Sequence, residues 1–278
     1  MDISILITTY NAAQYIVEAL ETLGNQTYPP SEVIIVDDGS TDATREIIQN
    51  FLNSHPQINI RLFSYPHIGR AAALHQGVQL AGCEWIAILD ADDLWHCQKL
   101  AQQVTAVQQY NLNFLATQSD IFYSTNEPDL TQEFVSLLKP VSLSLTQMLY
   151  ANLICHSSVL MRKNLAQYDL QRQTQIDYEL WLRLLHERKS LYILPQTLVY
   201  HRIHKKQSFE AQKKWRYIFN ATKLQLRYCF YHLKLLPACA LSMKLGYYLC
   251  FPRNIRLKIR TVAFLCKNKI NQITKIKA

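Results

Sequence analysis

Three short apolar runs near the start of the chain constrain its fold more than any other feature. They read ISILIT at 3–8, EVIIVD at 32–37 and EWIAIL at 84–89. An apolar run without polar alternation is typical of a strand that is buried on both faces. The three runs therefore predict the centre of a parallel sheet that is covered by helices.

The segments between these runs have other periods. Residues 12–24 and 69–81 show helical spacing of their apolar positions, and 58–65 alternate like a strand. A further helix is expected after DDGSTD, with Ser40 or Thr41 as its N-cap. This order of strands and helices predicts an α/β fold, with a Rossmann-like and mostly parallel sheet that is flanked by helices.

Residues 110–207 follow a less regular pattern than the first part of the chain. Residues 114–124 are expected to form one or two strands, 154–162 a strand, and 177–188 an amphipathic helix. After residue 208 the sequence is helical and basic. We therefore expect a catalytic domain at 1–209 and a basic helical extension at 210–278.

The charge of the chain is divided unevenly. Residues 1–210 hold 14 Lys/Arg and 21 Asp/Glu, whereas 211–278 hold 15 Lys/Arg and no acid. Basic helices that also carry many aromatic side chains are typical of segments that lie on an anionic membrane surface. Two alternatives are a helical appendage packed on the domain, and nucleic-acid binding, which we do not expect because no such module is recognisable.

Cysteines and the N-terminus indicate the compartment. The seven cysteines are scattered and form no C-x-x-C pair, which favours reduced thiols and argues against a structural zinc site. The N-terminus lacks the basic and long apolar regions of a signal peptide, and no uninterrupted apolar stretch is long enough to span a bilayer. We expect a cytoplasmic protein, peripheral on the inner face of the membrane.

Polar clusters follow each of the three buried strands. They are TTYN at 8–11, DDGSTD at 37–42 and DADD at 90–93. Ligands of parallel α/β sheets bind beyond the carboxyl ends of the strands, where these clusters are expected to meet. Bunched carboxylates suit Mg²⁺ or Mn²⁺, which usually bridge to substrate phosphates. The alternative is that the carboxylates of DADD merely cap the helix that follows.

Three blocks of sequence resemble the family 2 glycosyltransferases, which are inverting enzymes of the GT-A fold that use nucleotide-diphosphate sugars. They are SILITTYNAAQYIVEALETLGNQTYPPSEVIIVDDGSTDATREII, GRAAALHQGVQLAGCEWIAILDADD and IDYELWLRL. The resemblance covers roughly residues 1–208. It implies transfer of a sugar, with a UDP-sugar as the expected donor, to a hydroxyl of a glycan or lipid-linked acceptor.

The resemblance also implies roles for individual residues. The general base that takes the proton of the acceptor hydroxyl is expected to be Asp177. The metal is expected on Asp92, with Asp90 bonding the ribose or a metal-bound water and Asp93 orienting the loop or the acceptor. The remaining donor contacts are expected from Thr8, Tyr10, Asp37, Asp38, Arg70, Arg202 and His204.

The chain departs from the family pattern at three positions. Arg70 stands where the family often has Lys, which keeps the charge and adds a fork that suits phosphate oxygens. His75 replaces an Asn, and Ile176 replaces the first acid of the usual pair before the general base. These changes leave the catalytic acid in place but alter the surroundings of donor and acceptor.

Two other classes of function remain to be weighed. A GT-A domain could hold a nucleotide sugar without turnover, although retention of Asp38, Asp92 and Asp177 argues against this. A dinucleotide-dependent oxidoreductase would need G-x-G-x-x-G after the first strand, where this chain has TTYNAAQY. The sequence therefore favours the transferase.

Overall fold

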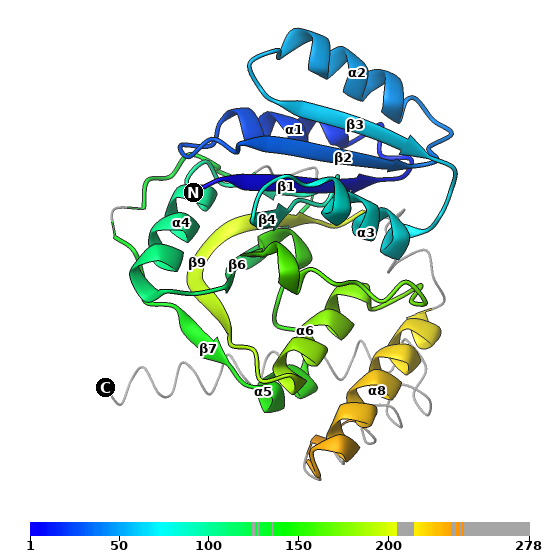
Figure 1. Cartoon of the computed structure of the whole chain (residues 1–278), viewed down its shortest axis with the longest axis vertical. Helices are drawn as coiled ribbons and strands as arrows, with labels where there is room; N and C mark the ends of the chain where they lie inside the picture. The colour runs from blue at the N-terminus through cyan, green and yellow to red at the C-terminus, as the bar shows by residue number, and fades with distance from the viewer. Residues whose placement is uncertain are drawn as a thin grey trace. The chain divides into compact units, whose positions relative to one another are not determined.

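A computed structural model describes residues 1–123, 126, 128–134, 136–204, 214–234, 237, 238 and 241. The chain divides into two units, Met1–Ala211 and Gln212–Ala278, and each is described by itself. Figure 1 shows the order of the elements.

The first unit alternates strands and helices up to residue 110 and is less regular beyond it. Its elements are β1 (Ile3–Thr9), α1 (Ile16–Gly24), β2 (Glu32–Asp38), α2 (Thr44–Ser54), β3 (Ile60–Tyr65), α3 (Arg70–Leu80), β4 (Trp85–Ile88), β5 (Leu94–Trp95), α4 (Lys99–Tyr110), β6 (Phe114–Phe122), β7 (Val141–Leu143), α5 (Leu145–Tyr150), the 3₁₀ turn η1 (His156–Ser158), β8 (Leu160–Arg162), the 3₁₀ turn η2 (Lys163–Leu165), α6 (Ile176–His186) and β9 (Leu191–Arg202).

The described strands form one mixed sheet in the order β3-β2-β1-β4-β8-β6-β9-β5, with β7 paired to β9. The pairs β3–β2, β2–β1, β1–β4 and β6–β9 are parallel. The short strands β8, β5 and β7 pair antiparallel to their neighbours. The α/β class is confirmed, and most of the paired length is parallel, although the sheet is mixed from β8 onward.

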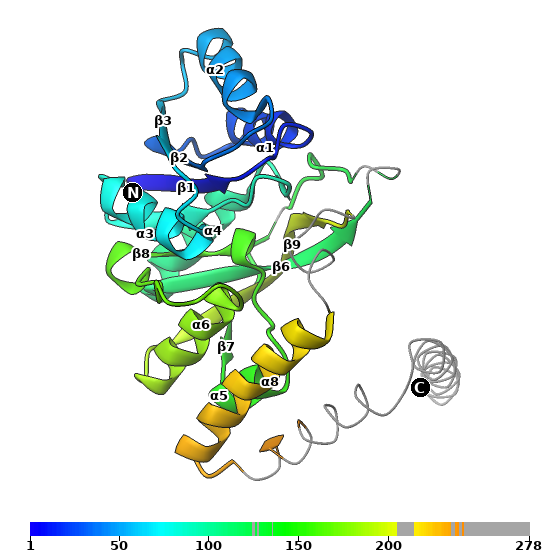
Figure 2. The same cartoon turned by 90° about the vertical axis from the view of Figure 1, so that its right-hand side faces the viewer.

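Helices cover both faces of the sheet, as the continuous apolar runs require. Ile3, Ile5 and Ile7 share one face of β1 and pack into the core that includes residues of α1, α2 and α4. On the other face Leu6 lies against Gly77 of α3, where an added Cβ would come within 2.1 Å of the leucine. Figure 2 shows the same sheet turned by 90°.

Two expected elements begin later than the sequence indicated. The helix after DDGSTD starts at Thr44 with Ala43 as N-cap, because Ser40 bonds Asp37 instead and Asp42 accepts a hydrogen bond from the backbone N–H of Thr44. The strand predicted at 154–162 is limited to β8, because the 3₁₀ turn η1 precedes it.

The second unit contains the helix α8 (Lys214–Tyr231), in which the Arg227 guanidinium lies 5.7 Å from the centre of the Tyr231 ring. Residues 242–278, which hold much of the predicted basic extension, lie outside the described residues. Among the helices that the structure describes, none combines the length and hydropathy needed to cross a bilayer.

Candidate active site

The predicted site residues come together at one edge of the sheet because four parallel strands end there. Since β8 is antiparallel to both β4 and β6, strands β6 and β9 run in the same direction as β1, β2 and β4. The carboxyl ends of β1, β2, β4 and β9 therefore share an edge. The reversal of β8 also brings the start of that strand, with turn η1, to the same edge.

The ends of β1 and β2 form the part of the site expected to hold the nucleoside. The Asp38 carboxylate accepts hydrogen bonds from the backbone N–H groups of Ile68 (2.7 Å) and Gly69 (3.1 Å). The Tyr10 ring is 48% exposed and stacks on His67 with centroids 4.4 Å apart. The structure thus places the exposed Tyr10 ring near the Asp38 carboxylate, which is held by the loop that precedes α3.

Asp37 lies fully buried beneath this surface. Its carboxylate accepts hydrogen bonds from the hydroxyl and the backbone N–H of Ser40. Arg45 approaches it to 3.8 Å. Asp37 therefore fixes the turn after β2, next to Thr8 on the end of the neighbouring strand β1.

Asp90 follows β4 and lies at the centre of a charged cluster. Its Oδ1 atom is 2.7 Å from Nη2 of Arg70 and 3.2 Å from Nδ1 of His156. The other ring nitrogen of His156, Nε2, is 3.0 Å from the Tyr168 hydroxyl. Burial favours the neutral acid, but Arg70 and His156 outweigh it and hold the pKa of Asp90 far below its usual value.

Arg70 links this cluster to the predicted general base. Asp90, and to a smaller extent Asp177, raise the pKa of the Arg70 guanidinium, so it stays charged. Asp177 lies in the first turn of α6, half-buried, and accepts a long hydrogen bond (3.3 Å) from the side chain of Asn152. The Arg70 guanidinium therefore interacts electrostatically with two carboxylates, Asp90 after β4 and Asp177 at the start of α6.

Asp92 faces the segment that follows β9. Its Oδ2 atom is 2.9 Å from Nε2 of His204. The His204 ring packs on Tyr15 with centroids 4.4 Å apart, and its Nδ1 atom is buried with no hydrogen-bond partner among the described residues. The structure thus brings His204 into direct contact with the DADD loop, and its expected contact with the donor stays a prediction.

Asp93 and Arg202 hold the DADD loop in place through hydrogen bonds. The Asp93 carboxylate is fully buried and accepts hydrogen bonds from the Ser157 hydroxyl (2.6 Å), the His201 ring (2.9 Å) and the Arg202 backbone (3.1 Å). Burial alone would lower the pKa of His201, but the bond to Asp93 raises it to about 9. His201 is therefore charged at neutral pH.

The Arg202 guanidinium is buried rather than presented to the edge of the sheet. It is 2% exposed, donates to the backbone oxygen of Asp92 (3.0 Å), and pairs with Glu18 on α1. The structure gives it a clear part in holding the DADD loop. Its expected contact with the diphosphate of the donor stays a prediction.

Sequence reasoning missed His156, Ser157 and Tyr168. His156 bridges Tyr168 and Asp90, and Ser157 accepts a hydrogen bond from the backbone of Asp90 (2.8 Å). The available signal was the polar HSS triplet inside an otherwise apolar strand pattern. Conversely, His75 does not join the predicted donor-site residues and faces a separate groove.

Two groups of side chains could hold a divalent cation. The Asp92 carboxylate and the His204 imidazole offer an oxygen and a nitrogen at the edge where phosphates are expected, and the unpartnered Nδ1 of His204 marks this ring as incompletely bonded. Both ligand types suit Mn²⁺, and the oxygen suits Mg²⁺. Asp93, Cys155 and His201 also place ligand atoms within 4.8 Å of one another, but Asp93 already accepts three hydrogen bonds. Among the described residues, the pair Asp92 and His204 is the candidate that lies on the residue predicted to bind the metal.

Comparison with known proteins agrees with this arrangement. Over 208 residues the chain is 30% identical to WfaP of Escherichia coli, a UDP-Glc:alpha-D-GlcNAc-diphosphoundecaprenol beta-1,3-glucosyltransferase, with 73% of this chain and 77% of the relative covered. The fold of this chain is similar to that of S. aureus TarS 1-349 in complex with UDP-GlcNAc, with a TM-score of 0.66 and 15% identity. The match covers 92% of this chain and 78% of the TarS chain. Against the longer TarS chain the coverage falls to 39% of that protein.

A second solved structure shares the fold at similar distance. It is the mannosyltransferase PcManGT from Pyrobaculum calidifontis in complex with GDP-Man and Mn2+, with a TM-score of 0.61, 17% identity, and 95% and 79% of the two chains covered. The sequence model of glycosyl transferase family 2 matches residues 4–168, which include the strands β1 to β4 and the DADD loop. The chain is a glycosyltransferase with a GT-A fold, and it belongs to glycosyl transferase family 2.

Proposed function

We propose that the protein is an inverting glycosyltransferase that moves a sugar from a UDP-sugar to a hydroxyl of a lipid-linked glycan. One observation carries the proposal: Asp92 with His204, Asp90 with Arg70, and Asp177 all lie around the carboxyl edge of the sheet. An acceptor is suggested by WfaP, whose name includes a diphosphoundecaprenol-linked sugar. The donor is suggested by WfaP and by the TarS complex.

The nucleoside end of the donor fits the ends of β1 and β2. The Tyr10 ring has an exposed face, and an aromatic face packs well against a base or ribose. Thr8 and Asp38 supply a hydroxyl and a carboxylate next to that face, which suit the polar edge of a pyrimidine. Because two backbone N–H groups already hold the Asp38 carboxylate, it is oriented before the donor arrives.

The diphosphate end fits Arg70 and the cation site. Arg70 is half-exposed, and its guanidinium has further N–H donors besides the one that Asp90 engages. Asp92 and His204 would hold Mg²⁺ or Mn²⁺, which when bound offsets the charge that builds on the leaving diphosphate. His156 and Arg70 hold the Asp90 carboxylate at a fixed position and keep it ionised.

The proton of the acceptor hydroxyl goes to Asp177. The start of a helix favours a negative charge, and the Arg70 guanidinium interacts electrostatically with this carboxylate. Attack on the anomeric carbon from the side opposite the leaving group needs one base and no covalent intermediate. This geometry gives inversion of configuration at the transferred sugar.

The experiment is release of nucleotide diphosphate from a panel of nucleotide sugars, with Mn²⁺ and with excess chelator. We expect turnover that depends on the cation, with a UDP-sugar as the best donor. Asp177→Asn should leave donor affinity nearly intact and lower turnover by about 10²-fold or more, the scale of general-base catalysis. Asp92→Ala should weaken donor binding when Mn²⁺ is present.

The outcomes separate the alternatives. Binding of a UDP-sugar without any release of UDP, even with acceptor lipid present, would indicate a non-catalytic nucleotide-sugar module. Full activity in excess chelator would contradict the role given to Asp92 and His204. Loss of donor affinity in Asp177→Asn, with turnover of bound donor retained, would make Asp177 a binding residue.

We also propose that the basic extension at 210–278 holds the enzyme on the cytoplasmic face of an anionic membrane, where a lipid-linked acceptor is presented. The support is that residues 211–278 hold 15 basic residues and no acid. Each contributes about 1 kcal/mol near an anionic surface, and this falls off within a Debye length. Flotation with anionic liposomes should therefore be lost at high salt, and equal binding to neutral liposomes would reject the electrostatic attraction.

A further inference from the structure

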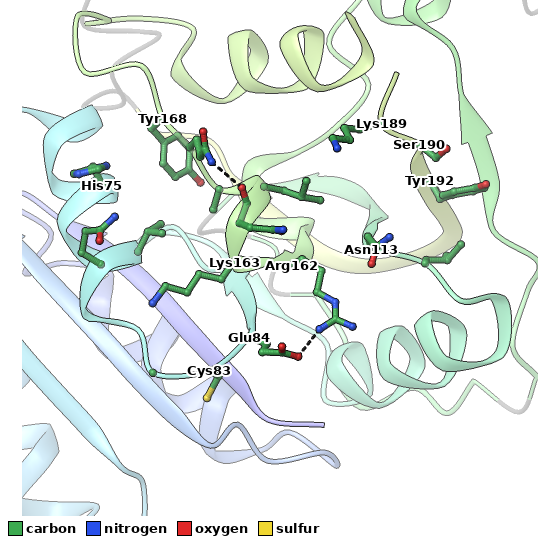
Figure 3. A pocket seen from close by; sticks show the side chains of 18 of the residues that line it. His75, Cys83, Glu84, Asn113, Arg162, Lys163, Tyr168, Lys189, Ser190 and Tyr192 are labelled. Atoms are coloured by element: carbon green, nitrogen blue, oxygen red, sulfur yellow. Dashed lines mark hydrogen bonds and ion pairs between the residues drawn. The ribbon is translucent and has the colours of Figure 1, made fainter. Parts of the chain in front are cut away.

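A large groove lies at the edge of the sheet opposite the candidate active site. Its volume is about 1210 Å³, and its walls include Glu84 before β4, Asn113 before β6, Ser190 before β9 and Arg162 at the end of β8. Because β8 is antiparallel, all four positions share the amino edge of the parallel strands. No residue expected to contact the donor lines this groove, which Figure 3 shows from close by.

The side chains that line the groove are strongly biased toward positive charge. The described lining residues include the cations Arg162, Lys163, Arg188 and Lys189 and a single carboxylate, Glu84. That carboxylate is already paired with Arg162, and the dashed line in Figure 3 marks the pair. The groove therefore presents an excess of positive charge to whatever enters it.

Two of the four cations are held by the protein, and two are not. Arg162 stacks over the Trp85 ring at 4.7 Å, and Lys163 donates to the backbone oxygen of Ala81 at 2.5 Å. Arg188 and Lys189 follow helix α6, are exposed, and make no ion pair within the described part of the chain. The first pair is thus a fixed wall of the groove, whereas the second pair is available to a ligand.

The other side chains that line the groove suit a sugar polymer as ligand better than they suit a flat or apolar ligand surface. Amide side chains of Asn113, Asn164 and Gln167 can each donate and accept hydrogen bonds, as sugar hydroxyls require. Tyr110 and Tyr192 add rings that combine an apolar face with a hydroxyl. A membrane surface would not enter a concave, amide-lined groove, and the volume exceeds the usual range of about 300–1,000 Å³ for a single small molecule.

We propose that this groove binds an acidic oligosaccharide, through the exposed cations Arg188 and Lys189 and the amides along its wall. Tyr168 also lines the groove, and its buried hydroxyl lies 3.0 Å from Nε2 of His156. Binding in the groove does not rest on the proposed transfer reaction, because the cations and amides that carry it are given no part in that reaction.

The test is binding of a short oligogalacturonate to the full-length protein, by calorimetry with the donor site filled by saturating UDP. The matched probe is the methyl ester of the same oligomer, which keeps the sugars and removes the carboxylates. We expect the acid to bind more tightly than the ester, and the difference to shrink as salt is raised. Equal affinity for the acid and the ester would overturn the proposal.

The decisive variant is Arg188→Gly with Lys189→Ala. Arg188 has a φ of +61°, a left-handed conformation that glycine adopts without strain, so the end of α6 should be preserved. We expect affinity for the acid to fall about threefold to tenfold, as for the loss of two exposed ion contacts. The control, Lys139→Ala, removes an exposed lysine of the first unit outside the groove and should bind as the unmodified protein does.

The other results are also decisive. Unchanged affinity in the groove variant, or an equal loss in the control, would place the contact elsewhere and reject the groove. If the protein binds anionic vesicles through Arg188 and Lys189 but binds no oligosaccharide, the groove is a membrane contact and the proposal is wrong. Lys189→Glu is a second variant that serves if the first one unfolds, and it should weaken binding of the acid but not of the ester.

Discussion

Lys99 allows a quantitative test of how the first unit is packed. Its side chain is fully buried at the start of α4, with Nζ 2.8 Å from Oε1 of Gln103 and 3.7 Å from the centre of the Trp95 ring. Burial lowers the pKa of Lys99 well below its ordinary value, 10.5, and no carboxylate pairs with it among the described residues. We therefore expect the folded protein to lose the Lys99 proton at a lower pH than the unfolded chain does.

The consequence is a pH dependence of stability with a fixed slope. In the pH range between the folded-state pKa of Lys99 and 10.5, the unfolded chain binds one proton more than the folded protein at this residue. The free energy of unfolding then rises by about 1.4 kcal/mol per pH unit. In Lys99→Met this contribution is absent, so the stability difference between wild type and variant should rise with pH across this range, by at most about 1.4 kcal/mol per pH unit.

Subtracting the curve of the variant removes other titrations. Burial raises the pKa of the neighbouring Cys155 thiol, which makes stability fall with pH in the alkaline range, but it does so in both proteins. The value at a single pH is less informative, because Lys99→Met also leaves Oε1 of Gln103 without its donor, at a cost of about 1–3 kcal/mol. This cost does not change with pH, so it does not affect how the stability difference varies with pH.

The assay is urea unfolding followed by tryptophan fluorescence at several pH values between 7 and 9.5. Lys139→Met is the control, because it removes an exposed lysine. Parallel curves for the wild type and Lys99→Met would refute the reasoning, since they would mean that Lys99 carries the same charge in the folded and unfolded states.

Three further predictions concern other contacts of this unit. Gly77→Ala should lower the free energy of unfolding by about 1–2 kcal/mol, because overpacking against Leu6 outweighs the gain in helix propensity, and unchanged urea stability would contradict the close approach. Glu32→Gln should destabilise the protein by about 1–3 kcal/mol at pH 7. Burial opposes ionisation of Glu32, but its hydrogen bonds and its arginine partner lower its pKa below 4.5, so this difference should shrink as pH falls below 4.5 and a constant difference down to pH 3 would count against it. His156→Ala should lower kcat/KM about tenfold by releasing Asp90, Tyr168→Phe should lower it less, and equal effects on both would argue for a purely structural role.

The part of the fold that sequence predicts well is the part where local pattern and burial agree. The runs at β1, β2 and β4 are apolar throughout because both faces of those strands are covered, so their pattern alone identifies them. The clusters after these strands are polar because their side chains bond the turns and loops there, as Asp37 does with Ser40 and Asp93 with Ser157. Parallel pairing then places the clusters at one edge without further information.

The parts that sequence does not predict depend on which distant strands pair. Nothing in ICHSSVLMR indicates that β8 inserts antiparallel between β4 and β6, yet that insertion is what carries His156 and Ser157 to Asp90. Likewise the contact of Asp92 with His204 depends on β9 running parallel to β6. Spacing along the chain cannot encode such contacts, because they follow from the order of strands in the sheet.

The place of β8 and β9 in the sheet has a consequence for how the protein is made. A nascent chain that has emerged as far as the DADD loop already holds four strands that can pair in parallel, with the turn after β2 and this loop at their ends. It still lacks His156, Asp177 and His204, which arrive with the last third of the first unit. Synthesis therefore completes the scaffold for the nucleoside well before the groups proposed for the cation and the acceptor. Truncation products that end after the DADD loop therefore keep these four strands but lack the residues proposed to hold the cation and to take the proton of the acceptor.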